Sequence, residues 1–365
     1  MQRAGIALLA LAITLGAIEI GMRITGAGDP SQGRGRRSYV GPAEHPDLDY
    51  APRPGARATA GHVRVSINSH GFRDREYERA RTPGVARIAV LGDSIAFGSG
   101  LPLQETFPKQ LEALLAEAGR STEVLNLGVF GYDVVDEVAF FEQVGAGFQP
   151  DLVILGFCIN DVGIHSANSR GLGWGQDLEG LGKHSRLARW LLQRRERTLL
   201  MQDFHRLNQD DEFSRQYAGS IDSLEGDPEQ RSRLADLRAA LDAAAAPVPF
   251  AEWYASEAKI GRLRHAFARL AELAAKGGFE VLVALIPYLD EQGHQDLYGR
   301  AYEIAALEAR RAGFEVLSLR DSFSARGAAE LRLERAGRPD PLHPNAEGHR
   351  LIAEELLSAL DPPRS

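Results

Sequence analysis

The sequence predicts an α/β protein with three layers, in which a five-stranded parallel sheet lies between two layers of helices. Short apolar runs recur from Ala86 onwards, and helical patterns lie between them. The apolar runs are continuous rather than alternating, which is typical of strands that are buried on both faces. Strands that alternate with helices favour a parallel sheet covered on both sides.

The strands and helices can be placed in chain order. The predicted strands are 87–92, 123–128, 151–157, 279–287 and 314–319. Helical patterns cover 106–119 and 262–278, and the second ends in Gly277-Gly278, a common C-terminal signal of helices. A last helix over 345–360 would close a domain that we expect to span 85–361.

One long stretch interrupts this rhythm. Residues 163–256 contain no clear buried strand, but they contain charged helical segments at 185–200 and 231–246. We therefore expect a helical insertion between the third and the fourth strand.

Composition excludes some classes of protein. The formal net charge of −8 argues against a general nucleic-acid binder, and the basic run at 33–37 is short. Cys158 is the single cysteine of the chain, so an intrachain disulfide and a cysteine-based zinc site are both excluded.

The N-terminal residues 1–26 predict a membrane anchor or a signal peptide. Residues 4–22 are almost wholly apolar, carry one charge at Glu19, and approach the length that spans a bilayer. An uncleaved anchor is favoured over a cleaved signal, because no clear cleavage site follows; Glu19 keeps a soluble helix as a third possibility. The domain would then be periplasmic or extracellular, and it would be secreted if the segment is cleaved.

Residues 27–84 are expected to form a linker and a short pre-domain segment. The part 27–60 is rich in Gly, Pro, Ser and Arg and predicts a tether. Residues 62–74 alternate apolar and polar side chains and then turn at 69–71, which predicts a short strand or hairpin.

Candidate site residues follow the predicted strands, because ligands bind at the carboxyl ends of parallel strands. Ser94 follows the first strand and is either a nucleophile or a helix-capping serine. Its surroundings are neither a Gly-x-Ser-x-Gly elbow, because Ala96 takes the last position, nor a phosphate loop.

Further candidates follow the other strands. After the second strand, Gly128 and Gly131 are either plain turn glycines or backbone N–H donors to an oxyanion. After the third, Asn160 is either a turn residue or an amide donor to the same oxyanion. Cys158 is expected to fill the core rather than to act as a nucleophile, since no basic residue lies near it in the sequence.

The last candidates precede the final helix. Asp340 and His343 form an Asp-x-x-His pattern, in which a short loop can place the carboxylate against the imidazole. His349 is expected to be structural. Together these residues supply a nucleophile, a base, an orienting acid and oxyanion donors at one edge of the sheet.

In these motifs the chain resembles the SGNH hydrolases, also called the GDSL-like esterase/lipase family. Gly92-Asp93-Ser94 is similar to the first block of that family, with Ile95 in place of the usual leucine. Gly131 matches the glycine of the second block better than Gly128 does. The third block, 156–161, has one extra residue before Asn160, and Asp340 with His343 matches the fourth. The resemblance covers 86–360 apart from the insertion.

The resemblance implies a flavodoxin-like (SGNH) sheet and a serine esterase or acylhydrolase. Ser94, Asp340 and His343 would form the catalytic triad, and Ser94, Gly131 and Asn160 would bind the oxyanion. No metal or cofactor would be needed. The substrate would be an O-acyl or O-acetyl ester of a glycan, a lipid or a small molecule. The anchor and the sequence at 67–74 also resemble bacterial membrane-tethered members of the family.

Other functions remain open from the sequence. The same site would be an O-acyltransferase if a hydroxyl of an exported polysaccharide replaced water. A non-catalytic binder of acylated glycans is a second alternative, and a membrane scaffold that acts through the insertion is a third. Trp174 and Trp190 in the insertion would either line an acyl channel or form its own core, and the core is favoured.

Overall fold

The computed structural model describes most of the chain in defined elements. The described residues are 2–25, 39–45, 48, 50–60, 63–163, 185, 187, 227–245, 247–289, 293–335 and 337–360. A five-stranded parallel sheet lies at the centre, in the order β6-β5-β7-β8-β9. The strands are β5 (Ala86–Gly92), β6 (Thr122–Asn126), β7 (Leu152–Phe157), β8 (Glu280–Leu285) and β9 (Glu315–Ser318). The predicted α/β fold class is confirmed.

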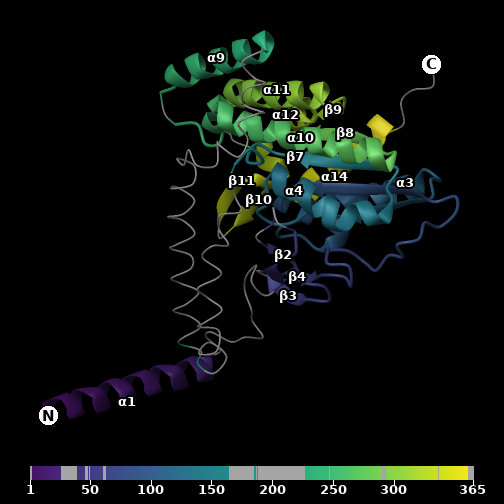
Figure 1. Ribbon diagram of the computed structural model, residues 1–365. Coiled ribbons are helices and arrows are strands. Elements are labelled where there is room, and N and C mark those ends of the chain that lie inside the picture. Colours follow the sequence, from purple (N-terminus) through teal and green to yellow (C-terminus); the bar gives the residue numbers. More distant parts are fainter. Residues whose placement is uncertain are drawn as a thin grey trace.

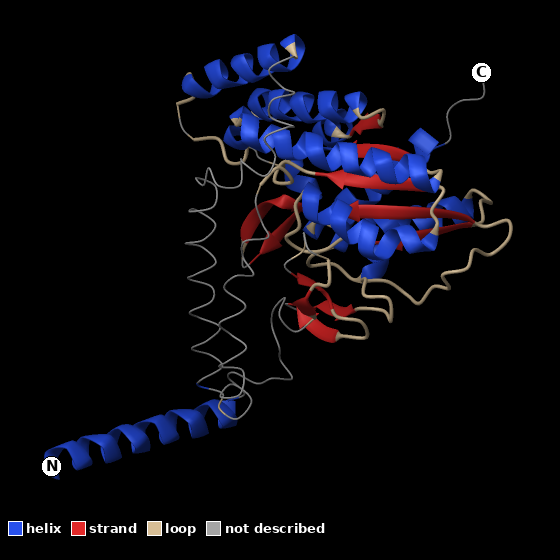
Figure 2. Cartoon of the chain, in the orientation of Figure 1, coloured by secondary structure: helices blue, strands red, loops and turns tan. Residues whose placement is uncertain are grey.

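The strand order explains where a site can form. The first strand, β5, pairs with β6 on one side and with β7 on the other, so the chain runs outward in both directions from β5. This is a topological switch point, where a crevice opens at the carboxyl ends of the strands. The five strands are parallel, and the arrowheads seen clearly in Figures 1 and 2 point toward the side of the molecule that carries the hairpin of β10 (Arg332–Arg335) and β11 (Arg338–Pro344).

Each face of the sheet is covered by helices. On β5, Ile88 and Val90 point into a core shared with α3 (Phe107–Glu117) and α14 (Ala346–Leu360). Ala89 and Leu91 point into the opposite core, which includes α4 (Val134–Phe140), α10 (Glu257–Gly277) and α11 (Gln295–Arg311). Because both faces are buried, the strands had to be continuously apolar, as the sequence showed.

Several short elements complete the domain. A π-helical turn, η4 (Phe141–Gly145), continues α4, and η3 (Leu103–Glu105) and η5 (Ala146–Phe148) are 3₁₀ turns. Two short helices, α12 (Arg320–Arg326) and α13 (Ala328–Leu331), connect β9 to the hairpin. The predicted helix end at Gly278 is confirmed, because Gly278 takes a left-handed conformation with φ of 69° and donates to Ala274 O.

The helical insertion is described only in its last part. The elements in that part are helical: α9 (Pro228–Asp242), which packs on α11, and the 3₁₀ turn η7 (Ala251–Ala255). The predicted helix at 231–246 is thus confirmed over most of its length. The predicted helix at 185–200, except residues 185 and 187, lies outside the described residues, as do Trp174 and Trp190.

Part of the predicted tether is instead structured and packed on the domain. Strands β1 (Val40–Pro42) and β2 (Tyr50–Pro52) form one hairpin, and β3 (Arg57–Ala60) and β4 (Val63–Ser66) form another. Tyr39 and Tyr50 are buried in the same core as the central sheet, so the segment 39–60 is not a free linker. The expected strand at 62–74 exists as β4, but its partner β3 precedes it, and the turn at Gly71 only redirects the chain.

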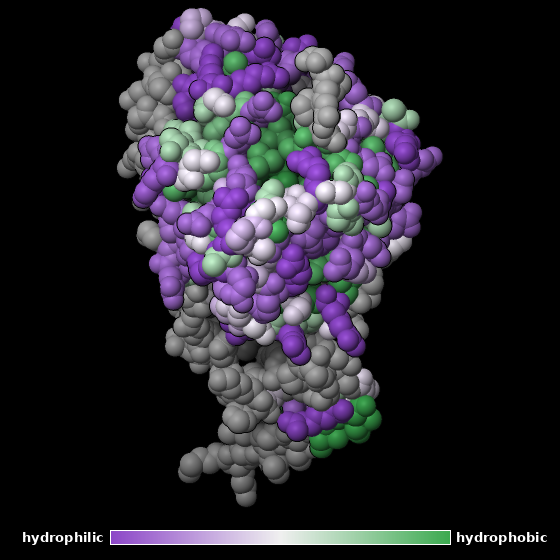
Figure 3. Space-filling model, turned by 90° about the vertical axis from the view of Figure 1, so that its right-hand side faces the viewer, coloured by the Kyte–Doolittle hydropathy of each residue, from purple (hydrophilic) through white to green (hydrophobic). Residues whose placement is uncertain are grey.

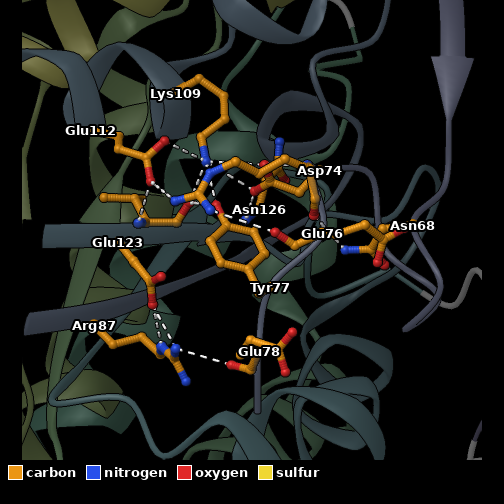
Figure 4. A network of polar contacts seen from close by, with 12 residues as sticks. Asn68, Asp74, Glu76, Tyr77, Glu78, Arg87, Lys109, Glu112, Glu123 and Asn126 are labelled. Carbon is orange, nitrogen blue, oxygen red and sulfur yellow. Dashed lines mark hydrogen bonds and ion pairs between the residues drawn. The ribbon is translucent and has the colours of Figure 1, made fainter. Parts of the chain in front are cut away.

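A buried polar network joins this N-terminal segment to the sheet (Figure 4). Lys109, on α3, bonds to both carboxylate oxygens of Asp74 at 3.0 and 3.1 Å and to the hydroxyl of Tyr77 at 2.7 Å. Asp74 also accepts from the backbone N–H of Asn126 on β6. Burial raises the pKa of Asp74 despite the opposing charge of Lys109. A buried ion pair with complete hydrogen bonding fixes position more than it adds stability.

The N-terminal helix α1 (Gln2–Thr25) precedes this segment, and only part of its side chains is described. Glu19 pairs with Arg23 one turn later. Among the described residues, no helix is found that is long and apolar enough to cross a bilayer.

Candidate active site

Ser94 lies directly beyond the end of β5. Gly92 ends the strand with φ of 150°, and a Cβ there would lie 2.7 Å from Ala96 Cβ and 3.1 Å from Gly156 O, so only glycine fits. Asp93 then caps the four-residue helix α2 (Ser94–Phe97), since its Oδ1 accepts from Ile95 N at 2.8 Å. This tight strand-to-helix turn places the Ser94 side chain at the carboxyl edge of the sheet.

The structure brings Ser94, His343 and Asp340 into one chain of contacts. Ser94 Oγ lies 2.8 Å from His343 Nε2, and His343 Nδ1 lies 2.9 Å from Asp340 Oδ2. This arrangement lets the imidazole accept the serine proton while the carboxylate fixes its tautomer. Asp340 and His343 lie on strand β11 rather than in the short loop that the sequence predicted. Asp340 pairs with Leu333 on β10, and His343 lies in the irregular stretch between that pair and the next one, Pro344 with Arg332.

Arg335, on β10, is a residue that sequence reasoning missed. Its Nε lies 2.7 Å from the same Asp340 oxygen that faces His343, and its Nη2 donates to Ser99 Oγ at 3.2 Å. Burial alone would raise the pKa of Asp340, but the hydrogen bond from His343 and the charges of His343 and Arg335 lower it below the ordinary value. Asp340 is therefore held as a carboxylate. The glycine at 337 was the turn signal for this hairpin in the sequence.

Asn160 reaches the nucleophile through Asp93. Its Nδ2 donates to Asp93 Oδ2 at 3.0 Å, and the same oxygen accepts from Ser94 Oγ at 3.1 Å. A primary amide carries two N–H groups, so the second remains able to donate to a substrate oxygen. Since the Ser94 hydroxyl has one proton, it donates either to Asp93 or to His343, and the Asp93 bond must be released when the imidazole takes that proton.

Gly131 lies in the loop between β6 and α4, with a left-handed φ of 79°. The loop is anchored at both ends, because Val129 N donates to Gly92 O and Val134 N donates to Asp161 O. Among the described residues, no hydrogen bond joins Gly131 to the other four candidates. Gly128 has a structural role. A Cβ there would lie 2.3 Å from Phe97 N, so only a glycine lets the loop pack against α2.

Three side chains beside the nucleophile have the spacing of a possible metal site. Ligand atoms of Asp93, Cys158 and Asp161 lie within 4.8 Å of one another. Each already takes part in hydrogen bonds: Asp161 Oδ2 accepts from Cys158 N at 2.7 Å, and Cys158 Sγ donates to Asn160 Oδ1 at 2.8 Å. Burial raises the pKa of Cys158 and of Asp161 well above the ordinary values, which disfavours the charged forms that bind metals. The cluster is better explained as a turn that holds Asn160.

Two residues have the structural roles that the sequence predicted. Cys158 is buried, with a thiol whose raised pKa makes it a poor nucleophile. His349 is buried on α14, where its Nδ1 accepts from Phe107 N at 2.9 Å and its ring stacks on Phe107. It packs under the site rather than taking part in it.

The chain is similar to known proteins. The sequence profile of the GDSL-like Lipase/Acylhydrolase family matches residues 90–351. An arylesterase of Vibrio mimicus is 31% identical over 75 residues, which cover 20% of this chain and 38% of the arylesterase. The chain thus spans less than half the length of that curated relative in the match.

Solved structures also match over most of the chain. The acetyl xylan esterase AlAXEase has a TM-score of 0.39 and 16% identity, covering 75% of this chain and 99% of that one. LAE5, an alpha/beta hydrolase enzyme from the metagenome of Lake Arreo in Spain, has a TM-score of 0.42 and 18% identity, covering 77% of this chain and 97% of that one.

Proposed function

The chain belongs to the GDSL-like lipase/acylhydrolase family, and from this premise we propose that it is a serine esterase that uses Ser94 as nucleophile. The observation that carries the proposal is the continuous contact from Ser94 Oγ to His343 Nε2 and from His343 Nδ1 to Asp340. These contacts give the serine a base and give the base an orienting carboxylate, which is what the activation of a serine requires.

The proposed reaction proceeds through an acyl-serine. His343 takes the proton of Ser94 as Oγ bonds to the ester carbonyl carbon, and Asp340 stabilises the resulting imidazolium. The negative charge on the carbonyl oxygen is stabilised by the N–H groups of Ser94 and Gly131 and by the Asn160 amide. His343 then gives its proton to the leaving alkoxide. Water, activated by the same imidazole, releases the acyl group and restores Ser94.

The proposed substrate is an ester with an O-acyl or O-acetyl group on a glycan, a lipid or a small molecule. The partial relative named as an arylesterase suggests an activated aryl acetate as the first assay probe. Transfer to a sugar hydroxyl uses the same acyl-serine, so it differs only in the acceptor of the second step.

We also propose that the N-terminal segment 4–22 anchors the protein to a membrane, with the domain outside the cytoplasm. Among the described residues, the large hydrophobic side chains that are exposed all belong to α1: Leu15, Ile18, Ile20 and Ile24. Figure 3 shows green, hydrophobic atoms at the foot of the molecule and a second green area in its upper half. An apolar helix surface of this kind favours a lipid environment.

The test of the proposed function is covalent labelling of the purified chain by a fluorophosphonate, combined with hydrolysis of p-nitrophenyl acetate. Ser94→Ala should abolish labelling, and His343→Ala should lower kcat by about 10³-fold or more. Ser121→Ala is the matched control, because Ser121 is an exposed serine at the opposite edge of the sheet. A folded wild-type chain that neither labels nor hydrolyses esters would contradict the proposal.

A further inference from the structure

The peptide unit that carries the Gly131 N–H is hydrogen-bonded at its carbonyl oxygen, which belongs to Phe130. Tyr50, on strand β2 of the N-terminal segment, donates its hydroxyl proton to the carbonyl oxygen of Phe130 at 2.9 Å. That carbonyl belongs to the same peptide unit as the N–H of Gly131. Tyr50 lies outside the residues matched by the family, 90–351, and nothing in the sequence motifs pointed to it.

A hydrogen bond on one end of a peptide unit determines where the other end points. The chain contains no cis peptide bond among its described residues, so the C=O of Phe130 and the N–H of Gly131 point in opposite directions. Glycine adopts positive φ freely, so a peptide next to Gly131 can rotate at low cost unless something holds it. The Tyr50 hydroxyl opposes such a rotation. It also polarises the amide, which makes the N–H a stronger donor.

Tyr50 is itself held by the residue that follows Gly131. The hydroxyl of Tyr132 donates to the backbone oxygen of Tyr50 at 2.5 Å, and the two rings lie 5.2 Å apart. Tyr50 is only 1% exposed and Tyr132 is also 1% exposed. Tyr50 thus donates to Phe130 and accepts from Tyr132. Both neighbours of Gly131 in the chain are therefore hydrogen-bonded to Tyr50.

We propose that Tyr50 is a positioning residue, which aims the Gly131 N–H at the oxyanion formed during ester hydrolysis. The inference rests on the proposed function, and it extends the site to a segment that precedes the family domain. Tyr50 does not touch the substrate in this proposal. It acts through the Phe130–Gly131 peptide.

The test compares Tyr50→Phe with Tyr77→Phe. Tyr77 is the control, because its hydroxyl also donates from the N-terminal segment to a backbone carbonyl, that of Val124 on β6, and accepts from Lys109. Its loss disturbs this segment without touching the Phe130–Gly131 peptide. Loss of a whole oxyanion donor costs about 10²–10³ in kcat, so loss of its alignment in Tyr50→Phe should cost about 10-fold. KM should change by less than about twofold, because the N–H acts on the transition state. Tyr77→Phe should leave kcat unchanged.

A second readout separates positioning from general destabilisation. An arylboronic acid forms a tetrahedral adduct with the serine, and its affinity should fall in Tyr50→Phe by the same factor as kcat/KM, but not in Tyr77→Phe. If Tyr50→Phe does not fold, Tyr132→Phe takes its place, and it should lower kcat by less than about 10-fold.

The outcomes distinguish the two proposals. An active wild type with unchanged kcat and boronate affinity in Tyr50→Phe would overturn the role of Tyr50 alone. Equal losses of kcat in Tyr50→Phe and Tyr77→Phe would also overturn it, because they would show a purely structural effect. A wild type that the fluorophosphonate does not label would overturn the proposed function and this inference with it.

Discussion

Asp340 Oδ2 accepts from both His343 and Arg335. Of these two partners, His343 could be predicted from the sequence and Arg335 could not. Asp340 and His343 were found from their spacing, because they lie three positions apart in the chain. Arg335 lies on the neighbouring strand, and its role depends on the register of β10 against β11. That register is a long-range property, and a short pattern in one strand does not specify it.

The second buried histidine makes stability depend on pH. Burial lowers the pKa of His349 to about 3, whereas an unfolded histidine has a pKa of about 6.5. Below about pH 6.5 the unfolded chain binds a proton that the folded chain cannot, so the folded state loses stability as the pH falls toward 3. At about pH 5 the loss from this group is about 2 kcal/mol.

His349→Gln should remove this dependence, because the amide oxygen of glutamine can still accept from Phe107 N. We expect urea unfolding at about pH 7.5 and about pH 5 to show a drop in stability that is smaller in the variant by about 2 kcal/mol. Parallel profiles for the wild type and the variant would show that His349 is protonated in the folded state.

At the scale of elements, the short helix α2 depends on the buried guanidinium of Arg73. A four-residue helix is not stable by itself, because it forms too few hydrogen bonds to offset its nucleation. Arg73 donates to the carbonyl oxygens of Phe97, Gly98 and Leu101 at 2.6 to 2.8 Å. Phe97 ends the helix, Gly98 is its C-cap, and Leu101 follows in the next turn, so the guanidinium holds the end of α2 and the turn after it. Burial lowers the pKa of Arg73 to about 10, which still leaves it charged at neutral pH.

Arg73→Met should therefore destabilise the protein by about 3 kcal/mol or more, because the carbonyl oxygens of Phe97 and Leu101 lose the guanidinium donor and that of Gly98 keeps only Leu101 N. Urea unfolding measures this loss, and the rate of fluorophosphonate labelling should fall with it, since α2 begins at Ser94. Arg75→Met is the control: Arg75 forms a half-exposed ion pair with Glu112, which should contribute less than about 1 kcal/mol. Equal effects of the two substitutions would contradict the role of Arg73.

The central strands were predictable from sequence, and the N-terminal strands were not. Strands buried on both faces need long apolar runs, and each of the five runs became a strand. By contrast, β1 and β2 have three residues each, and they lie among proline and glycine. In so short a segment no periodicity can be recognised, and its burial depends on contacts such as the stacking of Tyr39 on Phe97.

The whole molecule has a core that includes the N-terminal segment. Buried residues on one side of the sheet form a single cluster that runs from Tyr39 to Phe314. A boundary at residue 85 was a reasonable prediction, because the apolar runs begin there, but it cuts through this cluster.

A variant that begins at residue 39 should fold like the full chain, whereas one that begins at residue 85 should not. The shorter variant would expose the apolar surface that Tyr39, Tyr50, Ile67, Phe72 and Tyr77 bury in the full chain. Thermal unfolding and size-exclusion chromatography test this. A monomeric 85–365 fragment with a cooperative transition would show that the N-terminal segment is an accessory layer.

The contact between Ser94 and His343 joins residues 249 positions apart. A ribosome that adds about 5–20 residues per second needs roughly 12 to 50 s to travel between them. Throughout that interval the growing chain contains the serine without the base that would activate it. The nucleophile therefore stays unactivated until His343 has been synthesised and has folded against Ser94, so the ribosome is not exposed to a reactive half-made enzyme.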